Sequence, residues 1–257
     1  MIRFEKFQGT GNDFIVIDNR KSDFDDLPLD SIRKLCNRRF GIGADGLIWV
    51  KNHAHYDFEM RYFNADGSSS FCGNGARCAV KFAKSLNMFS NTTKFLAFDG
   101  VHEARITEGI VHLKMNDVSN IEVNEEAYVI DTGSPHFIKF VDDLAQIDIV
   151  GMGKEIRFSE KYRKEGINVN AVSKENNGIS LLTYERGVED ETLSCGTGAT
   201  AAALALVFSE NKLGDFELPV KVKGGNLSIS GFFDGKTFTN VYLSGPAEKV
   251  FDGTISI

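Results

Sequence analysis

The order of apolar and polar positions along this chain predicts strands and helices in alternation. Short runs rich in β-branched and aromatic residues, at 58–63, 180–184 and 220–223, predict strands. Residues 76–86 and 199–208 are apolar or small over most of a helical circumference. Because a helix that is apolar on nearly every side is buried, we expect a sheet to wrap around each of them.

Two further segments, 30–40 and 148–158, predict helices at the surface, each closing on an arginine and a phenylalanine. We expect the first to begin at Asp30, a residue type that commonly caps a helix. Helical spacing gives this segment one apolar side, which predicts core positions for Ile32, Leu35, Cys36 and Phe40.

The two halves of the chain match in order, at an offset of about 120 residues. Residues 72–76 read CGNGA, and residues 195–199 read CGTGA. Near the start of each half, 10–15 (TGNDFI) resembles 132–138 (TGSPHFI). The two surface helices fall between these matches, and we expect the halves to divide near residues 117–120.

Each half therefore has the same predicted plan. A strand, a glycine turn and a surface helix come first, and further strands and a Cys-Gly-x-Gly turn lead into the buried helix. The sequence predicts an α/β (α+β) fold of two pseudosymmetric domains, each a mostly antiparallel sheet or barrel wrapped around a central buried helix.

Composition narrows the classes of function. The chain has 257 residues and a net charge of −7 with scattered cations, so we expect a small-molecule substrate and no nucleic acid. No apolar run has the length of a signal peptide or a membrane span, and we expect a cytoplasmic protein without membrane contact. The four cysteines include no Cys-x-x-Cys pair, so neither a disulfide framework nor a metal site is expected.

The Cys-Gly-x-Gly turns at 72–75 and 195–198 carry the clearest chemical signal. Their glycines let the backbone approach a ligand closely. Each turn enters a helix, whose first N–H groups and positive dipole end favour an anion such as a carboxylate. A cysteine at a helix N-terminus can have its pKa lowered from about 8.5 to roughly 3.5–7.5.

Two such thiols in duplicated halves indicate chemistry on both faces of one carbon. One of Cys72 and Cys195 removes an α-proton as thiolate, and the other returns a proton from the opposite face. Helix N-termini that hold the carboxylate would stabilise the charge that develops. The plainer alternative is an inert buried thiol in each turn, and we expect that environment for Cys36 and Cys78.

At these residues the sequence resembles the diaminopimelate epimerase family over nearly its whole length. The matching segments are 11–14 (GNDF), 41–46 (GIGADG), 63–67 (FNADG), 72–78 (CGNGARC), 185–187 (ERG) and 195–198 (CGTG). The resemblance implies interconversion of LL- and meso-2,6-diaminopimelate in lysine and cell-wall precursor synthesis, with neither metal nor pyridoxal phosphate. It also implies a homodimer.

The resemblance further implies two domains that close over the substrate. The first comprises 1–118 plus 247–257 and carries Cys72, because the last strand, at about 250–257, returns to it. The second comprises 119–246 and carries Cys195.

Carried over position by position, the resemblance makes Cys72 and Cys195 the acid/base thiols, with His136 and Glu185 as their respective polar partners. The reacting carboxylate would be held by the backbone amides of Gly73, Asn74, Gly196 and Thr197. The other amino and carboxylate groups would be held by the side chains of Asn12, Asn64, Ser134, Asn168, Glu185 and Arg186. An arginine offers a two-pronged donor to a carboxylate, and a glutamate accepts from an ammonium group.

The chain departs from the family pattern in four places near these residues. The loop from Asn64 to Cys72 is one residue shorter, with serines at 68–70 where glutamate is frequent, and the loop from Glu185 to Cys195 is one longer. Ser134 stands where asparagine is typical, and Gly46 where some members have glutamine.

Three other readings remain open from the sequence. A proline or hydroxyproline racemase of the same broad fold would need no partners for a second amino-acid centre. A thiol redox or metal-binding protein would use the cysteines differently, and a non-catalytic amino-acid binder would bind without exchanging the α-proton.

Overall fold

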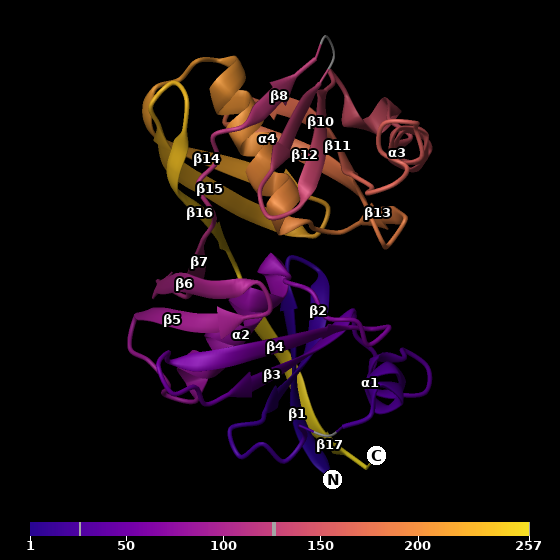
Figure 1. The fold of residues 1–257 in the computed structure, drawn as a ribbon, viewed down its shortest axis with the longest axis vertical. Helices are drawn as coiled ribbons and strands as arrows, with labels where there is room; N and C mark the ends of the chain where they lie inside the picture. Colours follow the sequence, from indigo (N-terminus) through magenta and orange to yellow (C-terminus); the bar gives the residue numbers. More distant parts are fainter. Residues whose placement is uncertain (26, 125–126, 257) are drawn as a thin grey trace. The chain divides into compact units, whose positions relative to one another are not determined.

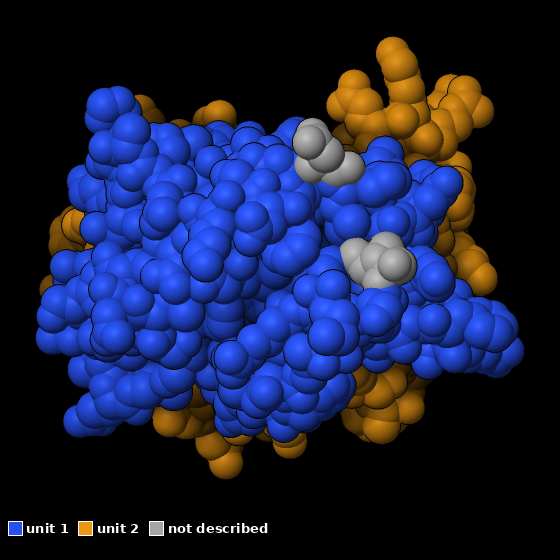
Figure 2. Space-filling model, turned by 90° about the horizontal axis from the view of Figure 1, so that it is seen from below, with its two compact units in different colours: residues 1–113, 245–257 blue, residues 114–244 orange. Residues whose placement is uncertain are grey.

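The computed structural model describes residues 1–25, 27–124 and 127–256 of the chain. The chain divides into two compact units, which Figure 2 distinguishes by colour. Unit 1 comprises Met1–Leu113 and Gly245–Ile257, and unit 2 comprises Lys114–Ser244. Among the described residues, each unit contains two α-helices packed against its strands (Figure 1), and unit 2 also contains a 3-10 helix, η1 (Leu144–Gln146).

The sheet of unit 1 has the strand order β17-β1-β2-β3-β4-β5-β6-β7. The pairs β2–β3 and β4–β5 are parallel, and the other neighbours are antiparallel. Its strands are β1 (Ile2–Gly9), β2 (Asn12–Asp18), β3 (Gly46–Lys51), β4 (Phe58–Asn64), β5 (Thr92–Ala97), β6 (Gly100–Thr107), β7 (Ile110–Lys114) and β17 (Glu248–Ile255).

The sheet of unit 2 has the order β8-β9-β10-β11-β12-β14-β15-β16, and β13 also pairs with β12. Here β10–β11 and β12–β14 are the parallel pairs. Its strands are β8 (Ile121–Val123), β9 (Tyr128–Asp131), β10 (Pro135–Phe140), β11 (Asn168–Glu175), β12 (Gly178–Glu185), β13 (Asp190–Thr192), β14 (Gly214–Val222), β15 (Gly225–Phe233) and β16 (Phe238–Gly245).

The two units repeat one topology. The run β2 to β7 has the same sequence of parallel and antiparallel neighbours as the run β10, β11, β12, β14, β15 and β16. The predicted pseudosymmetric α/β fold is therefore confirmed, and the predicted strands at 58–63 and 180–184 lie in β4 and β12. The third, at 220–223, overlaps only the end of β14, which begins at Gly214 and ends at Val222. The expected return of the last strand is confirmed by the pairing of β17 with β1; Ile257 lies outside the described residues.

The central helices are α2 (Gly73–Ser85) and α4 (Gly196–Ser209). α2 packs against β1 to β4, and α4 packs against β9 to β12, β14 and β15. Their burial confirms the prediction from composition. Both begin three residues earlier than the apolar pattern indicated, because the glycine turns form their first turns and a cysteine is the N-cap of each.

The first surface helix departs from the prediction at both ends. α1 (Leu29–Cys36) begins after Pro28, and Asp30 lies in its first turn rather than at its cap. It ends at Cys36 because the Asn37 side chain accepts hydrogen bonds from the backbone N–H groups of residues 39 and 40. Phe40 therefore lies outside the helix and is 79% exposed, so its predicted core position was wrong.

The remaining helix predictions hold. α3 (Ile149–Arg157) begins after Asp148, whose carboxylate accepts from the backbone N–H of Gly151. Ile32, Leu35 and Cys36 are buried against the sheet, as expected. Burial raises the pKa of the Cys36 thiol to about 11 and also raises that of Cys78, which is fully buried. Both thiols are core residues, as predicted.

Candidate active site

Cys72 lies between β4 and α2 and is the N-cap of the buried helix. Its backbone is extended, and its half-buried side chain accepts from the N–H of Gly75 at 3.5 Å. The thiol also donates to Oδ1 of Asn12, at the start of β2, at 3.6 Å. The N–H groups of the helix entrance favour the thiolate, whereas the oxygen of Asn12 pairs with the protonated thiol.

The orientation of Asn12 is fixed by a carboxylate. Its Nδ2 donates to Oδ2 of Asp45 at 2.6 Å, and a carboxylate can only accept. Oδ1 of Asn12 therefore points away from Asp45 and faces Cys72 and Nδ2 of Asn74, which donates to it at 3.2 Å. Three residues predicted for the site are thus in mutual contact in unit 1.

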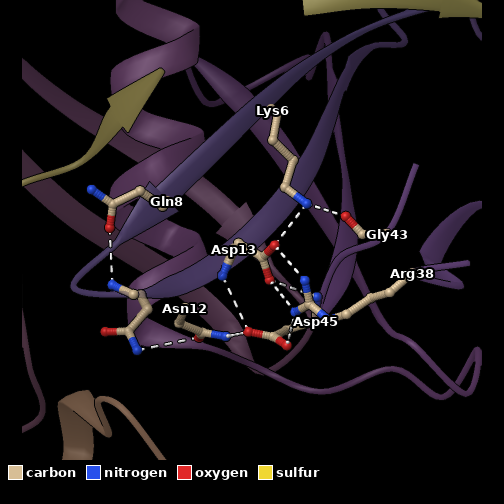
Figure 3. Close-up of polar contacts among 9 residues, drawn as sticks. Lys6, Gln8, Asn12, Asp13, Arg38, Gly43 and Asp45 are labelled. Atoms are coloured by element: carbon tan, nitrogen blue, oxygen red, sulfur yellow. Dashed lines mark hydrogen bonds and ion pairs between the residues drawn. The ribbon is translucent and has the colours of Figure 1, made fainter. Parts of the chain in front are cut away.

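Asp45 belongs to a network of charges that Figure 3 shows in full. Arg38 reaches the carboxylates of Asp13 at 2.6 Å and Asp45 at 2.7 Å, and Lys6 lies 2.7 Å from Asp13. Burial raises the pKa of Asp13, but hydrogen bonds and charges from Arg38 and Lys6 outweigh burial and hold it at about 2. The network anchors the loop that carries Asp45 to the strand that carries Asn12.

In the shortened loop after β4, serine side chains accept hydrogen bonds from the side-chain amide of Asn64. Nδ2 of Asn64 donates to Oγ of Ser68 at 3.0 Å and to Oγ of Ser70 at 3.1 Å. Two of the serines that replace the frequent glutamate therefore hold this predicted substrate ligand in the loop. No described hydrogen bond links Asn64 to Cys72.

The residues around position 46 leave no room for a side chain there. A Cβ atom added to Gly46 would lie 2.3 Å from the ring of Tyr62 and 2.6 Å from the carbonyl oxygen of Phe63. The glutamine of some family members therefore has no room at this position while Tyr62 keeps its place.

Arg77 lies in α2, and the sequence predicts no role for it. Its side chain is fully buried and donates to the carbonyl of Gly73 at 3.5 Å and to Oγ1 of Thr10 at 3.3 Å. Within the described residues no carboxylate forms an ion pair with it. Burial lowers its pKa, yet a guanidinium remains charged in proteins, so this helix carries a buried cation.

Cys195 is the N-cap of α4 in unit 2, as Cys72 is of α2 in unit 1. Its sulfur lies 3.4 Å from Oγ1 of Thr197, and that oxygen lies 2.9 Å from Nε2 of His136. The turn is held to the loop after β9 because Oγ1 of Thr132 donates to the carbonyl of Thr197. The structure thus brings His136 to the Cys195 turn through Thr197.

His136 is fully buried. Burial, together with the charge of Arg186, lowers its pKa from 6.5 to about 3. The imidazole is therefore neutral at physiological pH and acts in hydrogen bonding rather than as a cation.

Asn168 is the centre of a second group in unit 2. It faces His136 across the parallel pair β10–β11, and its Nδ2 donates to Oγ of Ser134 at 2.8 Å. Its Oδ1 accepts from the backbone N–H of Arg186 at 2.9 Å. The guanidinium of Arg186 in turn donates to the Glu165 carbonyl at 2.8 Å and to Ser134 at 3.4 Å, so Ser134 is bound from both sides.

Glu185 is half-buried at the end of β12, directly before Arg186. The longer loop after it folds back as β13, which pairs with β12 through residues 190–192. The loop is tied down where the Tyr184 hydroxyl donates to Glu189 at 2.8 Å. The extra residue therefore extends a hairpin.

Other kinds of site find no support among the described residues. They contain no group of three or more histidines, cysteines or acidic residues placed to hold a metal ion. Within the same residues, no helix is both long and apolar enough to cross a membrane. All four cysteines are described, and none is in a disulfide.

Known structures and sequences define the class. A phenazine biosynthesis protein of the PhzF family from Bacillus anthracis superposes with a TM-score of 0.78 at 12% identity, covering 100% of this chain and 99% of that one. A hydroxyproline epimerase from Agrobacterium vitis, with bound trans-4-OH-L-proline, gives 0.72 at 12% identity, with coverage of 99% and 90%. The chain thus has the two-unit fold that these proteins share.

The family is shown by sequence. A family model described as diaminopimelate epimerase matches residues 4–119 and 128–250, and a diaminopimelate epimerase from Flavobacterium psychrophilum is 48% identical over 257 residues, 99% of this chain and 100% of that protein. The chain belongs to the diaminopimelate epimerase family. It is accordingly an isomerase of the epimerase type.

Proposed function

We propose that the protein interconverts LL- and meso-2,6-diaminopimelate by removing the α-proton at one of Cys72 and Cys195 and delivering a proton from the other. The observation that carries the proposal is the duplicated geometry, in which a thiol caps the N-terminus of the buried helix in each unit. Family membership supports the substrate. The reaction uses neither metal nor pyridoxal phosphate and supplies lysine and cell-wall precursor synthesis.

In the proposed mechanism one cysteine is a thiolate and the other a thiol. The thiolate removes the α-proton from one face, and the thiol delivers its own proton to the opposite face, so the stereocentre inverts and the two thiols exchange ionisation states. The backbone N–H groups of Gly73, Asn74, Gly196 and Thr197, in the first turns of the two helices, hold the reacting carboxylate. Such fixed donors stabilise the negative charge that develops on it.

The other site residues serve recognition and tuning. We assign Glu185 as the polar partner of Cys195. The family resemblance pairs His136 with Cys72, but His136 contacts the Cys195 turn through Thr197, and we assign it to that turn. The amino groups and the second carboxylate are bound by the side chains of Asn12, Asn64, Ser134, Asn168, Glu185 and Arg186. This assignment is supported by the contacts that already orient most of these side chains within their own units.

The proposal also covers the setting of the reaction. The two functional domains are 1–118 plus 247–257 and 119–246, and they close over the substrate. The enzyme acts in the cytoplasm as a homodimer.

Incubation of LL-diaminopimelate with the protein in heavy water tests the proposal. Formation of the meso isomer with deuterium at the inverted α-carbon is the expected result, and Cys72→Ala and Cys195→Ala should each abolish epimerisation while retaining the fold. Full turnover in either variant would exclude the two-thiol mechanism. Binding without exchange would indicate a non-catalytic binder, and inversion of proline with none of diaminopimelate would indicate a racemase.

A further inference from the structure

A chain of buried polar side chains runs through unit 2 and reaches Cys195. It begins at Asn170, in the middle of β11, which is fully buried and which the sequence motifs did not single out. It continues through His136 of β10 and Thr197 of α4 to the sulfur of Cys195. The direction of each hydrogen bond along this chain can be derived from its first member.

The amide of Asn170 has one possible orientation. Its Nδ2 lies 3.1 Å from the backbone carbonyl oxygen of Phe137, which can only accept a hydrogen bond. Its Oδ1 accepts from the hydroxyl of Thr183 at 2.9 Å. Exchanging the two ends of the amide would set two oxygen acceptors against each other at Phe137, so the nitrogen faces that carbonyl.

The same nitrogen determines which ring nitrogen of His136 carries the proton. Nδ2 of Asn170 lies 3.1 Å from Nδ1 of His136. Nδ2 of Asn168 lies farther off, 3.5 Å from Nε2, and its two protons go to Oγ of Ser134 at 2.8 Å and to the carbonyl of Pro135 at 3.1 Å. Since an amide nitrogen donates, Nδ1 accepts from Asn170 and the single proton of the neutral ring is on Nε2. Nε2–H then donates to Oγ1 of Thr197 at 2.9 Å.

Thr197 continues the same direction of hydrogen bonding, from His136 to Cys195. With its oxygen accepting from His136, its own hydroxyl proton is available to Cys195, whose sulfur lies 3.4 Å away. A donor at this distance stabilises a thiolate more than a thiol. The threonine keeps its proton throughout, so it supports the ionised sulfur without entering the proton transfer.

We propose that Asn170 is a positioning residue that holds His136 in the Nε2–H form and thereby directs the hydroxyl of Thr197 at Cys195. Its effect on turnover rests on the proposed function, whereas its effect on the histidine and on the sulfur does not. The charge of Arg186 acts on His136, and the N-terminus of α4 adds a positive partial charge beside Cys195.

Two further observations indicate that the contact between Asn170 and His136 is a specific feature of unit 2. A Cβ atom on Gly198 would lie 2.7 Å from Oδ1 of Asn170 and 3.2 Å from Cε1 of His136, so the first turn of α4 closes over this pair. The register of β2 and β3 puts Phe14 and Ile48 at the equivalent positions in unit 1, and both are fully buried. The fold does not require polar residues there, and unit 2 alone has them.

Nitrogen-15 NMR of the substrate-free protein tests the tautomer directly. The His136 signals should report a protonated Nε2 and an unprotonated Nδ1 in the native protein. Asn170→Leu removes the donor to Nδ1 and should shift the population toward Nδ1–H, while Thr183→Val, which removes only the hydrogen bond to Oδ1 of Asn170, should leave the native form. A protonated Nδ1 in the unmodified protein would overturn the proposal.

Alkylation of Cys195 in a Cys72→Ser background tests the consequence at the sulfur. We expect the rate at neutral pH to fall about tenfold in Asn170→Leu and in Thr197→Val, with Thr197→Ser restoring it. In the protein with both cysteines, kcat should fall more than KM changes. Unchanged alkylation in a folded Asn170→Leu would refute the proposal, and if that variant fails to fold, unchanged alkylation in Thr197→Val would refute it.

Discussion

At the scale of single residues, the neutral state of His136 has a measurable effect on stability. In the folded protein the pKa of this ring is about 3, whereas the ordinary pKa of histidine is 6.5. Between these two values the unfolded chain binds a proton that the folded chain does not. The contribution of His136 to the free energy of unfolding is therefore greatest above pH 6.5, and it is lost as the pH falls from there toward about 3.

We predict that His136→Phe flattens the pH dependence of unfolding in that window. The wild-type free energy of unfolding should fall by up to about 1.4 kcal/mol per pH unit from this residue, and the variant should lose that part of the slope. Urea unfolding at several pH values measures the slope separately from the lower stability of the variant. His55→Gln, at an exposed position, should keep the wild-type slope, and an equal slope in His136→Phe would contradict the prediction.

At the scale of elements, the two buried helices begin alike in sequence but in different surroundings. A Cβ atom on Gly75 would lie 3.3 Å from the end of the Ile48 side chain, 3.4 Å from the ring of Phe14 and 3.5 Å from the end of Met60. On Gly198 it would meet the fixed amide of Asn170 at 2.7 Å. The two equivalent glycines therefore differ in how well they tolerate replacement by a larger residue.

We predict that Gly198→Ala is much more damaging than Gly75→Ala. The first displaces Asn170 and His136 and should cost about 1–3 kcal/mol of stability together with most of the activity. The second needs small side-chain shifts and gains helix propensity, so its stability should change by less than about 1 kcal/mol. Thermal unfolding and kcat of the two variants measure the difference. Equal losses of stability and activity in Gly75→Ala and Gly198→Ala would contradict the prediction.

The elements also show what the sequence could and could not reveal. Apolar periodicity and the internal repeat predicted the two buried helices, the surface helix α3 and the twofold plan, because these features depend on local spacing. The end of α1 was missed because it depends on side-chain hydrogen bonds of Asn37 rather than on periodicity.

Residues of the site were predictable only where a motif carries them. Cys72 and Cys195 stand in repeated turns, whereas Asn170 of β11 lies in no motif and Arg77 lies in the matched segment 72–78 without a predicted role. Their roles depend on hydrogen-bond direction and on burial, which no spacing encodes. The charge network around Asp13 likewise joins three separate segments.

At the scale of the whole molecule, the chain crosses between its units twice. β17 returns to unit 1 and pairs with β1 from Ile2 to Gln8, and the ring of Phe251 packs edge-on against Phe4. Unit 1 is therefore built from both ends of the sequence, and unit 2 from one continuous segment.

We predict that deleting residues 246–257 destabilises unit 1 selectively. Loss of the β17 ladder should cost on the order of 3 kcal/mol in unit 1 and accelerate hydrogen exchange at the backbone amides of β1 and β2. The amides of β10 and β11 should exchange as before. Hydrogen exchange followed by mass spectrometry measures both, and Phe251→Ser, which keeps the strand, should give a smaller effect. Faster exchange confined to unit 2 would contradict the prediction.

The return of β17 also has a consequence for biosynthesis. On the ribosome β1 emerges before every strand of unit 2, whereas its outer neighbour β17 is translated after all of them. The strands of unit 2 therefore leave the tunnel before that neighbour does, so the unit translated later can mature first. The edge of β1 stays unpaired until β17 has emerged.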